Sequence, residues 1–225
     1  MWGRRTAQVF PPAVDTWVRL GTLAAAVVVL GLALGGWDYA RSAYVTRVGW
    51  VRDQPVPFSH KHHVGDVGLD CRYCHTGVED SAEAGLPPTH TCMTCHSQLW
   101  TGAALLEPVR RSLASGQPIH WQRVSKLPDY VQFNHSIHVA RGVGCVECHG
   151  RIDQMPLTAR AEPFQMKFCL DCHRDPSTRL RPVALVTRME PLPWSEAERR
   201  AYGLRVMAAH RIDPKVLDNC EICHR

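Results

Sequence analysis

The chain has 225 residues and a formal net charge of +5, and 45% of its residues are hydrophobic. This length suits one modest domain. A basic balance alone does not indicate nucleic-acid binding, and no nucleic-acid-binding motif accompanies it, so we expect no nucleic-acid partner. The unusual features of the composition are ten cysteines and thirteen histidines.

The N-terminal region contains one apolar segment. Residues 20–37 carry no charged side chain, which is close to the roughly 20 residues that a membrane-spanning helix needs. Trp17 and Trp37 flank the segment as interfacial aromatic residues do. We therefore predict a transmembrane anchor over residues 17–40, preceded by a cytoplasmic segment, residues 1–16.

Every cysteine belongs to a Cys-x-x-Cys-His motif, the attachment signature of c-type haem. The two thiols form thioethers with the haem, and the adjoining histidine takes one axial position on the iron. Disulfides do not explain a histidine after each pair, zinc sites need closed sets of four ligands, and a thioredoxin-like centre needs one pair. Five covalently bound haems are therefore predicted, at sites 1 to 5 in chain order: Cys71/Cys74/His75, Cys92/Cys95/His96, Cys145/Cys148/His149, Cys169/Cys172/His173 and Cys220/Cys223/His224.

Haem attachment also bears on the anchor. Covalent attachment takes place outside the cytoplasmic membrane, so we expect a single-pass protein of that membrane with its N-terminus in the cytoplasm and its haem domain in the periplasm. A cleaved signal peptide is the alternative. It is disfavoured because the apolar core of such peptides is usually about 7–15 residues long, and the one cleavage-like sequence, Ala33-Leu34-Gly35, is weak.

An internal duplication introduces the motifs. The segment Phe-x-His-x-x-His occurs at residues 58–63, before sites 1 and 2, and again at residues 133–138, before sites 3 and 4. Two histidines three residues apart on a helical turn share a face, yet they can reach irons on either side of that turn. We predict that each segment supplies the distal ligands of both haems in its own module, namely His60, His63, His135 and His138. His62 has Ile137 as its counterpart and is predicted to be a surface residue.

Site 5 has no such segment before it, and its distal ligand stays open between Met166, His90 and His210. Met166 and His90 stand just ahead of sites 4 and 2. His210 ends a predicted helix that begins with a capping box at residues 195–198. A methionine ligand would raise the potential of its haem relative to haems with two histidines.

These motifs define the predicted fold class: a multihaem cytochrome c of loops and short α-helices wrapped around five haems, with one N-terminal transmembrane helix. Little apolar core is expected, because porphyrins occupy the interior. The predicted divisions after the anchor are residues 41–130 (first dihaem module and connector), 131–185 (second dihaem module) and 186–225 (C-terminal helix and fifth site). With a distal candidate for every iron, we expect electron transfer and no catalytic residue.

The chain resembles the pentahaem membrane-anchored cytochrome c subunit of alternative complex III, a quinol-oxidising complex. The resemblance extends from the anchor to Arg225 and is carried by FSHKHHVGDVGLDCRYCH, AGLPPTHTCMTCH, PIHWQRVSKLPDYVQFNHSIHV, GVGCVECHGRIDQMP, MKFCLDCHR and CEICHR. It implies the four paired histidines as distal ligands and favours Met166 at site 5. It also implies an iron–sulfur subunit and polytopic quinol-site subunits as partners, and a monohaem cytochrome c or terminal oxidase as electron acceptor.

Two other functions are compatible with an anchor and a multihaem domain. One is a freestanding membrane quinol dehydrogenase that feeds a periplasmic reductase, with a quinol pocket near Trp50, Arg52 and Asp53. The other is a membrane-bound electron-storage module. The subunits that co-purify with the chain distinguish all three.

Overall fold

The structure, a computed structural model, describes residues 9–224, so half of the predicted cytoplasmic segment lies outside the described residues. The chain divides into two compact units, residues 1–46 and residues 47–225, and each is described by itself.

The first unit consists of helix α1 (Ala13–Arg41) and the short helix α2 (Ala43–Thr46). Helix α1 has 29 residues, about 44 Å at 1.5 Å per residue, which exceeds the roughly 30 Å hydrocarbon thickness of a bilayer. Its most apolar 18-residue window has a mean hydropathy of 2.0, and none of that window is buried. The helix is therefore long and apolar enough to cross a membrane, and it contains the predicted span.

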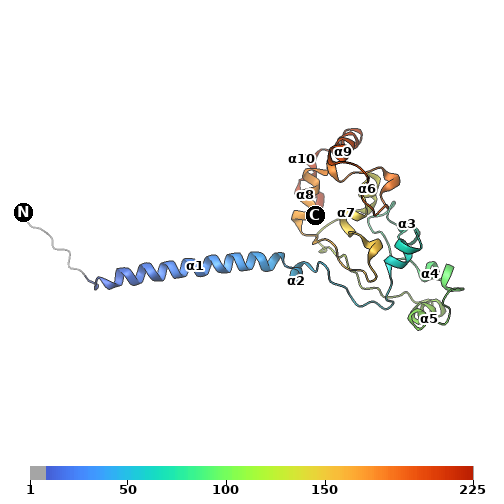
Figure 1. Cartoon of the computed structure of the whole chain (residues 1–225), viewed down its shortest axis with the longest axis horizontal. Coiled ribbons are helices and arrows are strands. Elements are labelled where there is room, and N and C mark those ends of the chain that lie inside the picture. The colour runs from blue at the N-terminus through green and yellow to red at the C-terminus, as the bar shows by residue number, and fades with distance from the viewer. Residues whose placement is uncertain (1–8, 225) are drawn as a thin grey trace, which may run out of the picture. The chain divides into compact units, whose positions relative to one another are not determined.

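The second unit is built from short helices joined by long loops (Figure 1). Between residues 47 and 224 there is no extended strand, and three isolated antiparallel bridges join Val51 to Ala159, Val131 to His224 and Val143 to Leu180. The helical elements are η1 (Lys61–Asp66), α3 (Cys71–Cys74), α4 (Thr89–His96), η2 (Ala104–Leu106), α5 (Glu107–Ser115), α6 (His135–Ala140), α7 (Val146–His149), η3 (Ile152–Gln154), α8 (Met166–Arg174), η4 (Pro176–Thr178), η5 (Val183–Leu185), α9 (Glu196–His210), α10 (Pro214–Leu217) and α11 (Cys220–Cys223).

The longest helix of this unit, α9, begins and ends where the sequence predicts. The Ser195 side chain accepts from the Glu198 backbone N–H, while the Glu198 carboxylate accepts from the Ser195 backbone N–H, so the predicted capping box is confirmed. Halfway along the helix Gly203 lies directly on η4, where a Cβ would overlap the carbonyl oxygen of Ser177. Helix α9 thus packs on the segment that follows site 4.

The apolar core of the described residues is very small. Six hydrophobic side chains are buried: Val56, Val109, Val139, Leu180, Val186 and Met189. A domain of this size usually holds itself together by burying far more apolar surface. Short helices, loops and a sparse core agree with the predicted class of fold.

Candidate haem sites

Each of the five motifs lies on a helical turn. They occupy α3, α4, α7 with the preceding Cys145, α8, and α11. Residues three apart on a helix share a face, so the two thiols of a motif point to the same side, next to the motif histidine. Within residues 9–224 no disulfide joins any of the ten cysteines, so both thiols of each motif can form thioethers.

The ten cysteines differ in their surroundings, although the sequence assigns all of them the same role. Cys95 of site 2 and Cys220 of site 5 are exposed, whereas the other eight are partly buried. Cys95 lies in the last turn of α4, where its thiol contacts the hydroxyl of the preceding residue, Thr94, at 3.9 Å. Local helical spacing sets which thiols pair, but only packing by distant segments covers them, so the sequence could not show this difference. Haem attachment at all ten cysteines stays a prediction.

The structure brings the four predicted distal histidines to the motif histidines of their own modules. In each module the first histidine of Phe-x-His-x-x-His faces the first motif, and the second histidine faces the second motif. The ring centroids and interplanar angles are His60–His75 (6.5 Å, 8°), His63–His96 (6.2 Å, 68°), His135–His149 (6.5 Å, 10°) and His138–His173 (6.2 Å, 24°).

This spacing fits a metal ion between the rings. Two bonds of about 2 Å between metal and imidazole nitrogen, plus about 1.1 Å from each nitrogen to its ring centre, separate the centroids by about 6 Å. Two imidazoles packed directly against each other would be nearer. The residues at sites 1 to 4 therefore fit six-coordinate haem irons with two axial histidines.

The Nδ1 atoms are engaged elsewhere, which leaves Nε2 for a metal. A ligating histidine typically donates its other N–H to an oxygen, and this fixes its tautomer and ring orientation. Eight of the nine histidines at the five sites show such a contact. Nδ1 of His60 contacts Thr158 Oγ1 at 2.9 Å. The other seven contact a backbone carbonyl oxygen: His63 (of Ser59, 2.9 Å), His75 (of Gly85, 2.8 Å), His96 (of Leu99, 3.2 Å), His135 (of Ala82, 2.8 Å), His138 (of Asn134, 2.7 Å), His173 (of Leu217, 3.0 Å) and His224 (of Tyr130, 3.3 Å).

The phenylalanine of each duplicated segment orients both of its histidines. Phe58 stacks on His63 at 4.3 Å and meets His60 edge-on at 4.9 Å. Its counterpart does the same in the second module, with distances of 4.5 Å to His138 and 4.7 Å to His135. One aromatic ring thus contacts both imidazoles of its module and restricts their orientation.

The two modules support each other's first histidine. In the first module, His60 contacts Thr158, and the Lys61 backbone N–H donates to the Met155 carbonyl at 3.0 Å. In the second module, the His135 backbone N–H donates to the Ala82 carbonyl at 3.2 Å, and Nδ1 of the same residue bonds that oxygen. Each acceptor belongs to the loop that follows the other module's first motif.

Burial keeps the central histidines uncharged. Burial, and after it the neighbouring His75, lowers the pKa of His60 to about 4. Burial followed by His135 does the same for His149, whose pKa is also about 4. The pKa values of His63 and His138 are lowered too, chiefly by burial. Neutral imidazole is the metal-binding form, so these side chains are ready to bind a metal at neutral pH.

Site 5 is anchored on the segment before the second duplicated phenylalanine. His224 stacks on Tyr130 at 5.9 Å, and the Gln132 backbone N–H donates to the Cys223 carbonyl at 2.8 Å. Of the open candidates for its distal ligand, Met166 is 68% exposed. His90 and His210 are also exposed.

Met166 is the first residue of α8, the helix that carries site 4. It precedes Cys169 by three residues on α8, so the two side chains share a face of that helix. His173, seven residues after Met166 on the same face of α8, contacts the Leu217 carbonyl just before site 5. This places Met166 on the face of α8 that contacts the segment just before site 5.

Some residues around the sites carry no recognisable signal in the sequence. Thr158 is a single threonine in a loop, and the carbonyl acceptors of the other histidines could come from any residue type. Trp100 lies against His96 at 5.8 Å and His62 at 5.4 Å. His62 lies against this ring with 42% of its side chain exposed, which agrees with its predicted place at the surface.

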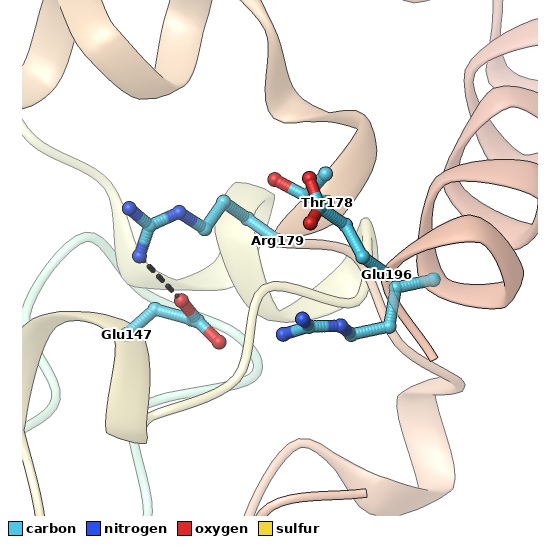
Figure 2. Close-up of a pocket in the computed structure, with 5 residues that line it drawn as sticks. Glu147, Thr178, Arg179 and Glu196 are labelled. Carbon is cyan, nitrogen blue, oxygen red and sulfur yellow. Dashed lines mark hydrogen bonds and ion pairs between the residues drawn. The ribbon is translucent and has the colours of Figure 1, made fainter. Parts of the chain in front are cut away.

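A polar pocket lies beside site 3. It is lined by Glu147, Thr178, Arg179, Glu196 and Arg199 (Figure 2). Glu147 is the middle residue of the site 3 motif, Cys-Val-Glu-Cys-His, and its carboxylate accepts from Arg179 at 2.8 Å and from the buried Arg181 at 2.9 Å. This carboxylate therefore ties the site 3 motif to the segment after site 4.

Parts of the chain are similar to known proteins. Residues 131–225 match the family described as "Cytochrome c7 and related cytochrome c". Over 123 residues, 54% of its length, the chain is 36% identical to a protein of Nitratidesulfovibrio vulgaris strain Hildenborough named "Menaquinone reductase, multiheme cytochrome c subunit". The match spans 55% of that relative's length.

Proposed function

We propose that this chain, which is of multihaem cytochrome c type, is the five-haem electron-transfer subunit of a membrane complex that acts on a quinone. The observation that carries the proposal is the set of four imidazole pairs at 6.2–6.5 Å, each beside a Cys-x-x-Cys-His motif. When bound, haem c supplies a one-electron redox centre at its iron. A second axial ligand on every iron leaves no open position for a substrate, which favours electron transfer over catalysis.

The proposed ligand sets follow the pairs. The five motif histidines bind the proximal side of the irons, and the ten cysteines hold the haems. On the distal side, His60, His63, His135 and His138 serve sites 1, 2, 3 and 4, and Met166 serves site 5. Met166 is preferred because its face of α8 also carries His173, which contacts the segment just before site 5, whereas His90 and His210 lie on other elements.

The proposed location is the cytoplasmic membrane. Helix α1 has the length and hydropathy of a membrane span. Because haem is attached outside the cytoplasmic membrane, the N-terminus would lie in the cytoplasm and the haem unit in the periplasm.

The proposed partners are an iron–sulfur subunit and polytopic subunits that hold the quinone site, with a monohaem cytochrome c or terminal oxidase accepting electrons from quinol. The named relative belongs to a menaquinone reductase, which favours a second candidate function, a complex in which electrons run toward the quinone. The same haem subunit serves either direction. The freestanding quinol dehydrogenase is the remaining alternative.

The test is purification of the tagged full chain in mild detergent, with mass spectrometry of its partners and a haem count by pyridine haemochromogen. Five haems together with iron–sulfur and polytopic subunits are expected. A lone cytochrome that oxidises quinol by itself would refute the subunit role. Assays of the intact complex with quinol plus oxidised cytochrome, and with quinone plus reduced cytochrome, decide the direction.

A further inference from the structure

Sites 1 and 2 touch through the middle residues of their motifs. The Tyr73 hydroxyl, inside the site 1 motif, lies 2.8 Å from the Thr94 hydroxyl, inside the site 2 motif. These two sites are therefore direct neighbours within the first module.

Site 1 also meets site 3, in the other module. The Thr187 hydroxyl donates to Asp70, the residue before Cys71, at 2.8 Å, while the Cys145 backbone N–H donates to the adjacent Val186 carbonyl at 2.9 Å. Sites 1 and 3 thus lie side by side across the module boundary.

The second module continues from site 3 to site 4 and then to site 5. Glu147 of the site 3 motif accepts hydrogen bonds from Arg179 and Arg181, which follow the site 4 motif. At the next step His173 Nδ1 contacts the Leu217 carbonyl at 3.0 Å, just before site 5. Figure 1 shows the same progression, with α4 at one edge of the unit, α3 and α7 inward of it, and α8 on the far side.

The exposure of the thiols agrees with this progression. The two exposed attachment cysteines, Cys95 and Cys220, belong to sites 2 and 5, whereas both cysteines of sites 1, 3 and 4 are partly buried. A site with neighbours on two sides has its thiols covered by them, and a site with one neighbour keeps one thiol open to solvent.

Resting on the proposed haem occupancy, we propose that the five attachment sites form one unbranched series in the order 2, 1, 3, 4, 5. The order departs from the order of the motifs in the chain. It follows from the duplication, because the two modules join through their first sites and turn their second sites outward. Sites 2 and 5 are then the two ends, and sites 1 and 3 form the junction that every crossing between modules uses.

The series is tested first by locating the five irons in the haem-loaded full chain, by cryo-electron microscopy or by diffraction at the iron absorption edge. The iron of site 1 should have those of sites 2 and 3 as its nearest neighbours, and the iron of site 4 those of sites 3 and 5. A site 2 iron that lies nearer to site 3 or site 4 than to site 1 overturns the series.

A second test uses the interaction between neighbouring redox centres. His63→Met at site 2 should raise the potential of that site, and an electron held there disfavours reduction of whatever lies beside it. In a redox titration resolved by NMR, the apparent potential of site 1 should therefore fall more than any other. His60→Met at site 1 is the matched variant, and it should lower the apparent potentials of both site 2 and site 3.

The series is wrong if His63→Met lowers the apparent potential of site 3, 4 or 5 more than that of site 1. The haem count separates this result from failure of the proposed function. Fewer than five haems refutes the occupancy, whereas five haems with different neighbours refutes the series alone.

Discussion

The two modules hold their imidazole pairs at the same separations with different backbones. The first histidine pairs are both separated by 6.5 Å and the second pairs both by 6.2 Å. The sequences between histidines and motif are unequal, because seven residues separate His63 from Cys71 and six separate His138 from Cys145. The ring separations are thus alike, as expected if each pair binds one haem iron, while the connecting segments differ in length.

The extra residue is accommodated in the helix that carries the histidines. Element η1 is a π-helix, whereas its counterpart α6 is an α-helix. In η1 the Val67 backbone N–H donates to the His62 carbonyl, five residues earlier. A π-turn holds one more residue than an α-turn and is frequent at functional sites. We attribute the difference between the modules to this single insertion.

The largest effect is expected when a duplicated histidine is removed. His60→Ala and His135→Ala should each convert one haem from low-spin to high-spin, because each leaves one iron without a distal ligand. The control is His62→Ala, which lies beside the ligands and should leave all five haems low-spin. Electron paramagnetic resonance of the oxidised full chain measures the change. Low-spin spectra in both variants would refute the ligand assignment.

Substitution of two equivalent glycines, one in each module, should lower the stability of the protein by different amounts. Gly68 and Gly142 hold the same place before their motifs, with φ of +81° and +82°. A Cβ at Gly142 would overlap the Arg181 carbonyl oxygen, whereas the space at Gly68 is open. Gly68→Ala should cost about 1–2 kcal/mol for the left-handed backbone, and Gly142→Ala about 1–3 kcal/mol more for overpacking.

Denaturant unfolding of the haem-loaded chain gives the two free energies. Equal losses of stability in the two variants would show that the backbone conformation, and not the contact with Arg181, decides the cost.

The fifth site, which has no counterpart in either module, should be spectroscopically distinct. Sulfur–iron(III) ligation gives a near-infrared charge-transfer band that haems with two histidines lack, and Met166→Ala should abolish it. Met155→Ala is the control, because Met155 lies in the loop after site 3. A band that survives Met166→Ala would transfer the ligand role away from this residue.

Substitution of Thr158 should change the reduction potential of site 1 alone. The hydroxyl of this residue accepts from His60 Nδ1, whereas the equivalent His135 uses a backbone carbonyl that substitution leaves in place. An acceptor at Nδ1 raises the basicity of the ligand and so stabilises iron(III). Thr158→Val should raise the potential of site 1, Thr158→Ser should restore it, and Ala82→Val should leave site 3 unchanged. Five unchanged potentials in Thr158→Val would contradict this role.

The smallest effect is expected at the residue before Cys71. Asp70 caps α3 by accepting from the Arg72 backbone N–H, and the corresponding position of the second module is Gly144. Hydrogen bonds from the Arg72 side chain lower the pKa of Asp70 to about 2, below its usual 3.8. The carboxylate therefore stabilises the fold above about pH 3.8, and this contribution is lost as the pH falls through about 2.

Asp70→Asn should cost about 1 kcal/mol or less at neutral pH, because the group is partly exposed. Thermal unfolding of the two proteins should converge as the pH falls from about 4 to about 2. Glu79→Gln, which removes the other carboxylate bound to Arg72, is the control. If the difference in unfolding temperature between Asp70→Asn and the parent stays constant as the pH falls, ionisation of Asp70 is not involved.

The sequence by itself determined the local features of this protein. The motifs, the duplicated histidine segments, the apolar helix and the capping box of α9 are all contained in windows shorter than 30 residues. Helical periodicity fixes which neighbours share a face over such distances. The predicted class of fold followed from the same patterns, since closely spaced motifs leave room for little else.

Tertiary structure decided which distant segments support which histidine. Thr158 is 98 residues from His60, and Ala82 is 53 residues from His135. The order 2, 1, 3, 4, 5 likewise rests on contacts between loops, such as that of Thr187 with Asp70. A backbone carbonyl accepts a hydrogen bond whatever its side chain is, so such partners carry no sequence pattern. They become visible only when the chain has folded and brought the loops together.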